Sequence, residues 1–302
     1  MINGIINVYK EKGFTSHDVV AKLRGILRQK KIGHTGTLDP DAEGVLPVCL
    51  GNATKLCDML ADRSKTYETI LQLGIETDTQ DSSGQICNER PVTCTDEEIK
   101  AVIVDFVGEY QQIPPMYSAK KINGKKLYEL AREGKVVERK PCQVHIYDIV
   151  ILDIDMKQHR VRMRVHCSKG TYIRTLCHDI GQRLGCGACM AYLLRTQVSQ
   201  FVLENSLTLD QIQQLTQEDL LLPKVFPSDQ AFSGYCSITV KPEADALIYN
   251  GNPIRKTHVA SCTEGNKELY RIYDSKGKFI GVYTWLEEKK QYKPYKMFLS
   301  QS

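Results

Sequence analysis

"KIGHTGTLDPDAEGVLPVCLG", residues 31–51, changes character halfway along its length. The first half is too polar and too rich in glycine for a helix, and its acidic residues include Asp39, Asp41 and Glu43. The run from Val45 to Leu50 is apolar enough to be a buried strand. We therefore predict an acidic loop that is anchored in a core at its far end. Chemically active side chains are commonly held on such loops.

Two familiar kinds of ligand site do not fit this stretch. An EF-hand calcium loop that starts at Asp39 needs a glutamate at its twelfth position, where this sequence has Leu50, and Pro40 lies inside the loop. The run "GHTGT" lacks the G-x-G-x-x-G spacing of a dinucleotide-binding loop. The stretch therefore predicts neither a calcium site nor a dinucleotide site.

The composition suits a globular protein. The chain has 302 residues, of which 42% are hydrophobic and 25% are charged, enough for one large and one small domain. Its formal charge of +4 permits a nucleic-acid partner without requiring one. The sequence begins without a secretory pattern and has no run of about 18 apolar residues. We expect a cytoplasmic protein with no membrane partner.

The chain contains 11 cysteines, an odd number, and several of them lie in apolar runs. This pattern favours reduced and mostly buried thiols over disulfides. Cys186 and Cys189, with Cys177 and His178 upstream, imitate part of a zinc site. One C-x-x-C without a second matching pair is weak evidence, so packing cysteines are the favoured interpretation and no metal is predicted.

Predicted strands and helices follow one another in an irregular order. Ser16 is expected to cap the first helix, and Thr95 with Glu98 forms a capping box for the second. The predicted strands cover residues 5–9, 45–50, 65–74, 144–155 and 160–167, and the predicted helices cover 16–27, 95–110 and 173–184. This order predicts an α+β core with a mixed, mainly antiparallel sheet and flanking helices.

A second, smaller domain is expected at the C-terminal end. The proline-punctuated stretch 221–234 is interpreted as a linker. Beyond it, short strands and a hairpin that turns at "DSKGK" predict a β-rich unit of roughly 65 residues, near the lower limit for independent folding. We therefore expect a large domain over residues 1–230 and a small β-barrel domain over residues 236–302.

Basic residues gather at several places, chiefly in an insertion around residues 114–140. The lysines there alternate with Tyr117 and Tyr128, and three arginines follow one face of a predicted strand. The lysines are Lys120, Lys121, Lys125 and Lys126, and the arginines are Arg160, Arg162 and Arg164. A solvated surface explains any one cluster, but clusters combined with aromatic residues leave an RNA-binding surface equally open.

Other residues of the sequence set Asp39 apart from an ordinary loop aspartate. An isolated aspartate in a loop is usually a turn residue or a cap. Here His34 precedes it by five residues, and Tyr172 and Arg174 open a distant helix. A buried carboxylate needs a cation to remain charged, and arginine keeps its proton. We therefore single out Asp39 and Arg174 as candidates for chemistry.

The run "GHTGTLDPDAEGVLPVCLG" closely resembles the signature of the bacterial tRNA pseudouridine-55 synthase (TruB) family. Further blocks resemble the family in the same order: "KTYE", "TDTQDSSG", "PPMYSAKKINGKKLYELAREG" and "CSKGTYIRTLCHDIGQRLGCGA". The resemblance covers residues 3–230. The C-terminal segment is similar, less sharply, to the PUA domain, an RNA-binding β-barrel attached to this family.

The resemblance implies an isomerase that converts a uridine in the tRNA T-loop (position 55) to pseudouridine, without cofactor or metal. Asp39 matches the family nucleophile, which is plausible because a free carboxylate is ionised at neutral pH. Its attack on C6 of uracil or on C1′ of ribose stays open. Arg174 matches the arginine that pairs with this aspartate. Tyr67 matches the tyrosine that stacks on the base and relays a proton at C5.

The resemblance also implies residues that bind the substrate. Tyr172 and Leu193 match positions that line the uracil pocket, and His34 matches the histidine that takes the space of the flipped base. The remaining expected substrate contacts are Lys10, Lys120 and Lys121. One departure lies after the first strand, where Lys10 is followed by Glu11 instead of the family's proline. The implied partner is the T-arm of tRNA, bound by a monomer.

Two rival interpretations remain. A uracil C5 methyltransferase also attacks C6, but with a cysteine and a nucleotide-like cofactor, for which the sequence offers no Gly-rich loop between a strand and a helix. A non-catalytic RNA-binding or RNA-folding module would not depend on Asp39. Substitution of this residue therefore separates the enzyme from the binding module.

Overall fold

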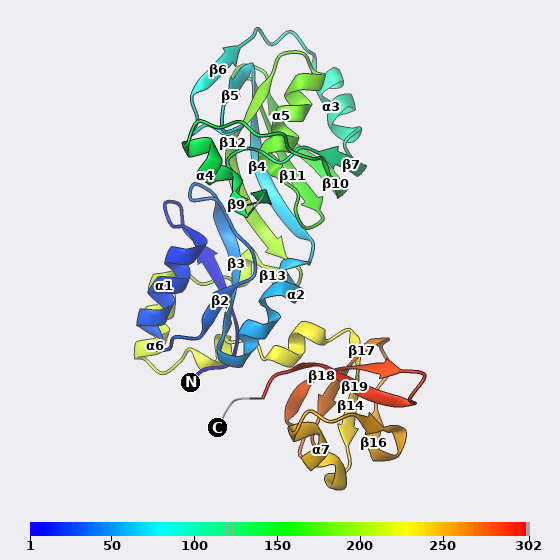
Figure 1. Ribbon diagram of the computed structural model, residues 1–302. Helices are drawn as coiled ribbons and strands as arrows, with labels where there is room; N and C mark the ends of the chain where they lie inside the picture. Colours follow the sequence, from blue (N-terminus) through cyan, green and yellow to red (C-terminus); the bar gives the residue numbers. More distant parts are fainter. Residues whose placement is uncertain (119, 123, 300–302) are drawn as a thin grey trace.

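The computed structural model describes residues 1–118, 120–122 and 124–299, without the side chain of Lys121. One long twisted sheet runs through most of the molecule, and a smaller sheet lies beside its lower end (Figure 1). The smaller sheet contains the C-terminal residues. This arrangement agrees with the predicted large α+β unit and small β unit.

The main sheet runs through the large unit from end to end. Within the described residues it has nine strands, in the order β1-β3-β12-β4-β11-β10-β7, with β2 beside β3 and β13 beside β12. Their bounds are β1 (Gly4–Lys10), β2 (Ile32–His34), β3 (Glu43–Leu50), β4 (Lys65–Leu73), β7 (Gly108–Gln112), β10 (Cys142–Asp155), β11 (Arg160–Cys167), β12 (Ala188–Val198) and β13 (Phe201–Val202). Only β12 and β3 pair in parallel among the strand pairs described in this sheet. The sheet is therefore mixed and mainly antiparallel, as predicted.

Helices cover the sheet at both ends. α3 (Asp96–Val104) lies near β10 and α5 (Ile173–Arg183) lies near β12 and β4, where their apolar side chains form a core with those of the sheet. α1 (Ser16–Ile26) and α6 (Leu209–Gln217) cover β1 and β3 and form a second core. α2 (Cys57–Ala61) follows a 3-10 turn after β3, and β5 (Ile75–Thr77) pairs with β6 (Ile86–Glu89). No helix among the described residues is long and apolar enough to cross a membrane.

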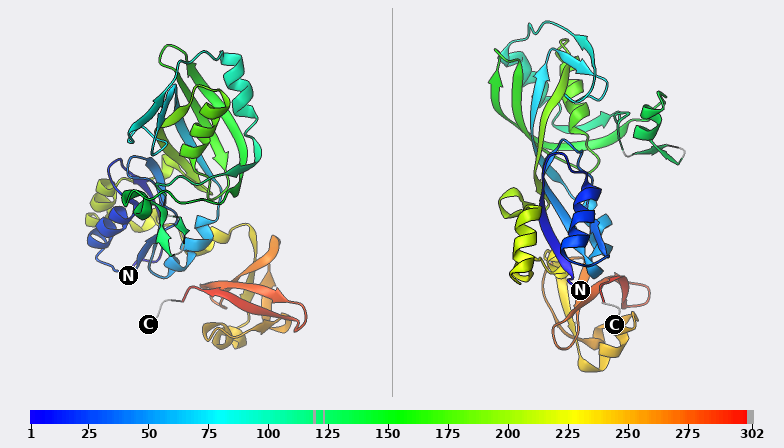
Figure 2. Two further views of the ribbon diagram at one scale, coloured as in Figure 1. Left: turned by 45° about the horizontal axis from the view of Figure 1, so that its top comes forward. Right: turned by 90° about the vertical axis from the view of Figure 1, so that its left-hand side faces the viewer.

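An arm, residues 114–140, extends from the body of the large unit (Figure 2). It carries the short strands β8 (Lys121–Ile122) and β9 (Lys125–Lys126) and the helix α4 (Leu127–Arg132). Leu127 is the one helical residue of α4 that is buried. The helix ends at Arg132, and Gly134 follows it with a φ of +70°.

Two helix predictions need correction. Thr15, not Ser16, is the N-cap of α1, because the Thr15 hydroxyl accepts from the Asp18 amide and Asp18 completes a capping box. The helix predicted over 95–110 begins as expected after the Thr95 capping box but ends at Val104. Gly108 adopts a φ of +110°, which a helix does not allow, and residues 108–112 form an edge strand instead.

The C-terminal residues form a barrel-like sheet. In this described part, six strands run in the order β15-β19-β18-β17-β14-β16 and enclose their own core. The elements are β14 (Tyr235–Val240), α7 (Asp245–Tyr249), β15 (Ile254–Arg255), β16 (Val259–Cys262), β17 (Asn266–Tyr273), β18 (Phe279–Leu286) and β19 (Gln291–Met297). The predicted hairpin turn at "DSKGK" joins β17 to β18.

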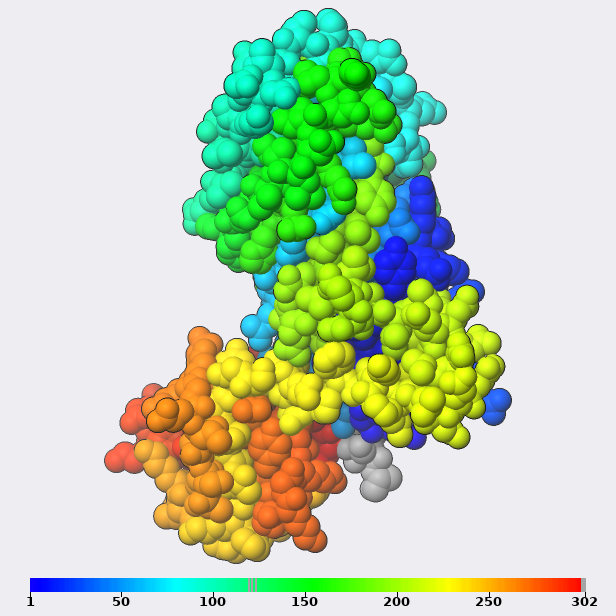
Figure 3. Space-filling model, turned by 180° about the vertical axis from the view of Figure 1, so that it is seen from behind, coloured from blue at the N-terminus to red at the C-terminus, as the bar shows by residue number. Residues whose placement is uncertain are grey.

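The predicted linker 221–234 is not a free tether. Phe226 pairs through its backbone with Ile5, and Phe232 is buried in a cluster that includes Leu56 of the large unit and Phe298 of the small one. From behind, the segment lies against the base of the large unit before it enters the small one (Figure 3). Proline punctuation predicted the break in regular structure correctly, but the apolar side chains of the segment, Phe226 and Phe232, pack the two units together.

Candidate active site

A cleft of about 990 Å³ opens where the loop before β3, the arm, the start of α5 and the centre of the sheet meet. Asp39, Tyr67 and Arg174 all line it, together with Tyr172 and Leu193. These side chains come from four separate segments of the chain, since Tyr172 and Arg174 both lie at the start of α5. The structure therefore brings together the three expected catalytic residues and three of the expected substrate contacts, Lys120 being the third.

Buried polar groups of the protein body hold the loop that carries Asp39 in place. The Leu38 amide donates to the Ser16 hydroxyl at 2.9 Å, and Leu38 itself is buried. Lys10 is fully buried, and its ammonium group donates to the carbonyl of Pro40 at 3.1 Å and to that of Phe14 at 2.6 Å. Both neighbours of Asp39 in sequence are thus held, so the position of its carboxylate is defined by the body of the protein.

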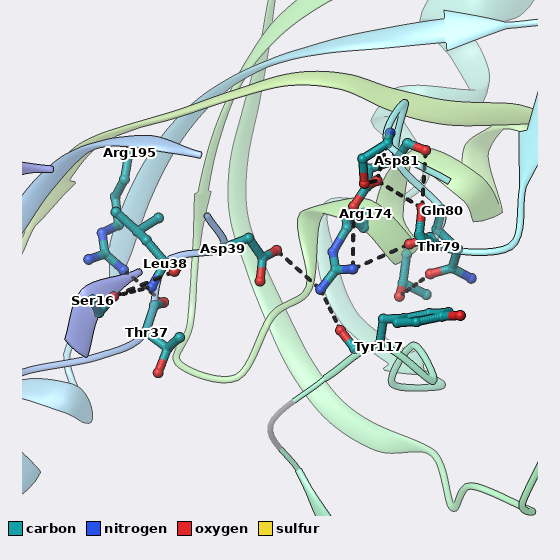
Figure 4. Close-up of polar contacts among 12 residues, drawn as sticks. Ser16, Thr37, Leu38, Asp39, Thr79, Gln80, Asp81, Tyr117, Arg174 and Arg195 are labelled. Carbon is teal, nitrogen blue, oxygen red and sulfur yellow. Dashed lines mark hydrogen bonds and ion pairs between the residues drawn. The ribbon is translucent and has the colours of Figure 1, made fainter. Parts of the chain in front are cut away.

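Arg174 joins three loops at the floor of the cleft (Figure 4). Its guanidinium lies 3.1 Å from the Asp39 carboxylate and 3.4 Å from that of Asp81. The same group donates to the backbone carbonyls of Thr79 at 3.3 Å and Tyr117 at 2.9 Å. Since five N–H donors lie in one plane, arginine suits such a junction better than lysine.

The Asp39 carboxylate is partly desolvated but accessible. Burial raises its pKa above the usual range, and the opposing effect of the Arg174 charge is smaller. The nearby Asp81 carboxylate raises the pKa further. The side chain nevertheless keeps 41% of its surface exposed to the cleft. A carboxylate in this position is both reachable from the cleft and held by the Arg174 cation.

Tyr67 lies in the middle of the sheet with its side chain buried. It pairs with Val165 on β11 and with Arg195 on β12. Burial raises the pKa of Tyr67 to about 12, while the Arg195 charge lowers it. The phenol is therefore neutral at physiological pH and can donate a proton.

Tyr172 and Leu193 form walls of the cleft. Tyr172 is the N-cap of α5, and its backbone is held by the buried side chain of Gln112, which accepts from its amide at 2.7 Å and donates to its carbonyl at 2.9 Å. Leu193 is buried in β12 beside Thr69. A lining that contains an apolar side chain and an aromatic one suits a flat ring.

Two expected substrate contacts lie elsewhere. Lys10 has no exposed surface and supports the Asp39 loop, so its expected contact with substrate is corrected to a positioning role. His34 ends β2 behind His17, with ring centroids 5.1 Å apart and the rings edge to face. His17 lines the cleft in its place. The expectation for His34 therefore stays a prediction for the RNA-bound protein.

The basic residues divide into two groups. Lys120 and Lys126 of the arm line the cleft, whereas the side chain of Lys121 lies outside the described part of the structure. On the sheet surface, Arg162 and Arg164 form ion pairs with Glu68 at 2.8 and 3.0 Å. Because one carboxylate serves both, the arginine stripe is less available for RNA than the arm.

The sequence analysis missed two charged residues of the site. Asp81 lies in a turn rich in polar residues, where a carboxylate carries no distinguishing signal. Arg195 occupies a buried position of a strand, and a charged residue in the buried register of "AYLLRTQV" was a signal that could have found it. Cys186 and Cys189 of the C-x-x-C pair were interpreted as packing cysteines, and both are buried.

The fold is that of a pseudouridine synthase. The chain superposes on one chain of a Cbf5-Nop10-Gar1 complex with a TM-score of 0.74 and 28% identity, over 98% of this chain and 85% of that one. A chain of an H/ACA RNP bound to a substrate RNA containing 2′-deoxyuridine gives a TM-score of 0.73 and 26% identity, with the same coverage.

Sequence comparison defines the family. Residues 24–173 match the model of the TruB family pseudouridylate synthase N-terminal domain, and residues 174–233 match that of the tRNA pseudouridylate synthase B C-terminal domain. A protein of Lachnoclostridium phytofermentans named tRNA pseudouridine synthase B is 55% identical over 99% of this chain and 100% of its own length. One of Clostridium kluyveri with the same name is 43% identical, with the same coverage. The chain belongs to the TruB family of pseudouridylate synthases and is an isomerase.

Proposed function

We propose that this enzyme converts the uridine at position 55 in the T-loop of tRNA to pseudouridine, with Asp39 as the nucleophile. The observation that carries the proposal is the ion pair between Asp39 and the buried Arg174 in an open cleft. The names of the relatives support tRNA as the substrate.

The reaction moves the glycosidic bond from N1 to C5 of the same uracil. The base must leave the folded loop to enter the cleft, which costs a few kcal/mol. Asp39 attacks either C6 of uracil or C1′ of ribose, and the bond between N1 and C1′ breaks. The ring turns, C5 bonds to C1′, and Asp39 is released. C5 loses one proton and N1 gains one, so no oxidant, reductant or other co-reactant is consumed.

The cleft residues have separate tasks in this scheme. Arg174 holds the nucleophile, and Tyr67 exchanges protons with the ring. Tyr172 and Leu193 confine the uracil between them. Because both walls are preformed by buried contacts, the site gains its precision before RNA binds.

Binding of the T-arm is assigned to the arm and to the small unit. Lys120 and Lys126 bring positive charge to the cleft rim. In the C-terminal part, Lys256 lies 4.9 Å from the Trp285 ring, beside a second cavity of about 510 Å³ that is also lined by Tyr270 and Lys267. Aromatic faces combined with lysines suit unpaired nucleotides. We therefore propose a catalytic domain over residues 1–230 and a PUA-like RNA-binding domain over 236–302 that act together as a monomer.

Variants of the small unit test its role. Changing Lys256 and Lys267 to Ala should raise the Michaelis constant for tRNA and leave turnover at saturation unchanged, as expected when uniform binding is lost. The matched control is Lys289→Ala, an exposed lysine on the turn before β19. If the changes of Lys256 and Lys267 leave the Michaelis constant as unchanged as the control does, RNA binding by residues 236–302 is contradicted.

The function is tested on an unmodified tRNA transcript without any added cofactor. After incubation, carbodiimide adducts of pseudouridine block reverse transcription and map the modified position. We expect one block at position 55, which is absent from a transcript with cytidine there. A block only at another uridine would contradict the assigned position, and no block at all would contradict the proposed reaction.

A further inference from the structure

Arg195 is a buried cation in the wall of the cleft. It lies on β12 between Tyr67 on β4 and Gly44 on β3, with 1% of its surface exposed. A Cβ atom on Gly44 would lie 2.2 Å from the carbonyl oxygen of Arg195, and Gly44 adopts a φ of +106°. This close approach of the two strands fixes the backbone from which the arginine side chain starts.

The guanidinium group is only partly satisfied. Nε donates to the Val45 carbonyl at 2.7 Å, and Nη1 donates weakly to that of Thr37 at 3.5 Å. Nη2 is buried and has no hydrogen-bond partner among the described residues. Arg195 also forms no ion pair within the part of the chain that the structure describes, in contrast to Arg174. A buried cation without an anion is costly, so a protein that keeps one needs it for a charge that appears during function.

The phenol of Tyr67 is the group on which such a charge can appear. The two residues are direct partners across β4 and β12, so their side chains share one face of the sheet. Charged or titratable groups face Tyr67 from the loop, β11 and β12, namely Asp39, Cys167 and Arg195. Burial raises the pKa of Cys167 to about 12, so this thiol is neutral. Of these groups, Arg195 is the one that favours a phenolate.

We propose that Arg195 is a positioning residue that stabilises Tyr67 as a transient phenolate during proton transfer. This inference rests on the proposed function. When the N1–C1′ bond breaks, its electron pair stays on uracil, and the phenol gives its proton to this anion. The phenolate then takes the proton from C5 after the new C5–C1′ bond has formed. One proton has moved from C5 to the ring nitrogen, and Tyr67 is restored.

The covalent step strengthens the effect of Arg195. In the free enzyme the Asp39 charge raises the pKa of Tyr67 and opposes the arginine. Once Asp39 is bonded to the substrate as an ester, this negative charge is gone. The Arg195 cation then acts on the phenol without this opposing charge, at the stage when the phenolate has to form.

The test compares Arg195→Met with Arg195→Lys in single-turnover reactions on the tRNA transcript. Loss of the cation should slow the reaction by about 10²–10³-fold at neutral pH, and Lys should restore part of the loss. The dissociation constant for tRNA should stay the same, because Arg195 is buried. The rate of the Met variant should rise about tenfold per pH unit above neutrality, where hydroxide supplies the phenolate, whereas the wild-type rate should level off.

A double variant separates this role from a structural one. If Arg195 acts through Tyr67, adding Arg195→Met to Tyr67→Phe should cause no further loss. Independent, multiplying losses, or a rate of the Met variant that does not depend on pH, would overturn the inference. If Arg195→Met does not fold, the same cycle and pH profile are measured with Arg195→Lys. Wild-type turnover on the same transcript tests the proposed function separately. If the wild type shows no turnover, the proposed function itself is contradicted, and not only the role of Arg195.

Discussion

The loop before β3 and the arm line the same cleft but are held in opposite ways. The loop lies on buried groups, among them the hydroxyl of Ser16 and the ammonium of Lys10. The arm is built on two-residue strands and a six-residue helix, and its Val136 is 84% exposed. The arm meets the catalytic contacts at its base, where the Tyr117 carbonyl accepts from Arg174.

This difference matches two different physical tasks. A nucleophile has to be placed within a fraction of an ångström, which requires neighbours that cannot move. Contacts with RNA phosphates depend mainly on charge, which lysines on a solvated surface provide. Changes under the loop should therefore affect turnover, and changes on the arm should affect binding.

Of the changes that leave Asp39 in place, loss of Arg174 should have the largest effect. Arg174→Met leaves the carboxylates of Asp39 and Asp81 together without their cation. We expect the free energy of unfolding to fall by about 3–5 kcal/mol, as for other broken buried pairs, and turnover to fall by at least about 10²-fold. Urea denaturation and single-turnover kinetics measure the two effects.

Arg132→Met is the matched control for this variant. Arg132 also lines the cleft but lies on the arm and is exposed. The Arg132→Met variant should bind tRNA more weakly but keep its free energy of unfolding and its turnover. Equal behaviour of the two methionine variants would remove the distinction between loop and arm.

Loss of the Ser16 hydroxyl should have a smaller effect of the same kind. In Ser16→Ala the buried amide of Leu38 loses its acceptor, at a cost of about 1–3 kcal/mol. Because Leu38 precedes the proposed nucleophile, we expect turnover to fall about tenfold while tRNA binding is kept. The comparison variant is Ser118→Ala on the arm, whose buried hydroxyl has no partner among the described residues. It should change neither property, and a loss of turnover there as large as in Ser16→Ala would contradict the account.

Changes to the arm lysines should appear in the salt dependence of binding. Lys120→Ala combined with Lys126→Ala should flatten the slope of log affinity against log salt by about 2, one for each phosphate contact. Turnover at saturating tRNA should remain normal. Lys157→Ala, at the exposed turn between β10 and β11, serves as the control and should leave the slope unchanged. If the two variants give the same slope, the arm lysines do not contact phosphate.

The smallest effect concerns pH. Because the pKa of Asp39 is raised, the nucleophile takes up its proton at a higher pH than an ordinary aspartate does. The acid limb of the single-turnover rate should therefore have its midpoint above the pKa of an ordinary aspartate. A raised carboxyl pKa also means that the Asp39 contribution to folding becomes more favourable as pH falls through it. The protein should thus still be folded where this limb appears, which circular dichroism checks.

The sequence predicted the frame of the molecule better than its site. Strands such as β4 and β11 alternate buried residues with half-buried or exposed ones along their whole length, and that period is visible in the sequence. The capping box at Thr95 is equally local. The end of α3 depended on Gly108, whose positive φ a helical pattern does not reveal.

The site could not be assembled from local signals. Asp39 and Arg174 meet only because β3 pairs with β12 and because α5 packs on the same sheet. Their pairing was expected from the resemblance to the family, whereas Asp81 needed the structure. The role of Lys10 also depends on the tertiary fold, because its partners are backbone carbonyls that any sequence supplies.

Asp39→Asn tests the central claim most directly. Three proteins are compared: the wild type, Asp39→Asn and the neighbouring Asp41→Asn. Each is mixed, in excess over RNA, with a tRNA transcript that carries tritium at C5 of uridine 55. The release of tritium to water is then followed. We predict rapid release by the wild type and by Asp41→Asn, and a rate lower by at least about 10⁴-fold for Asp39→Asn. Asp39→Asn should bind tRNA as tightly as the wild type and melt no earlier, because Arg174 keeps Asp81 as its partner. Near-normal release by Asp39→Asn would contradict the assignment of the nucleophile.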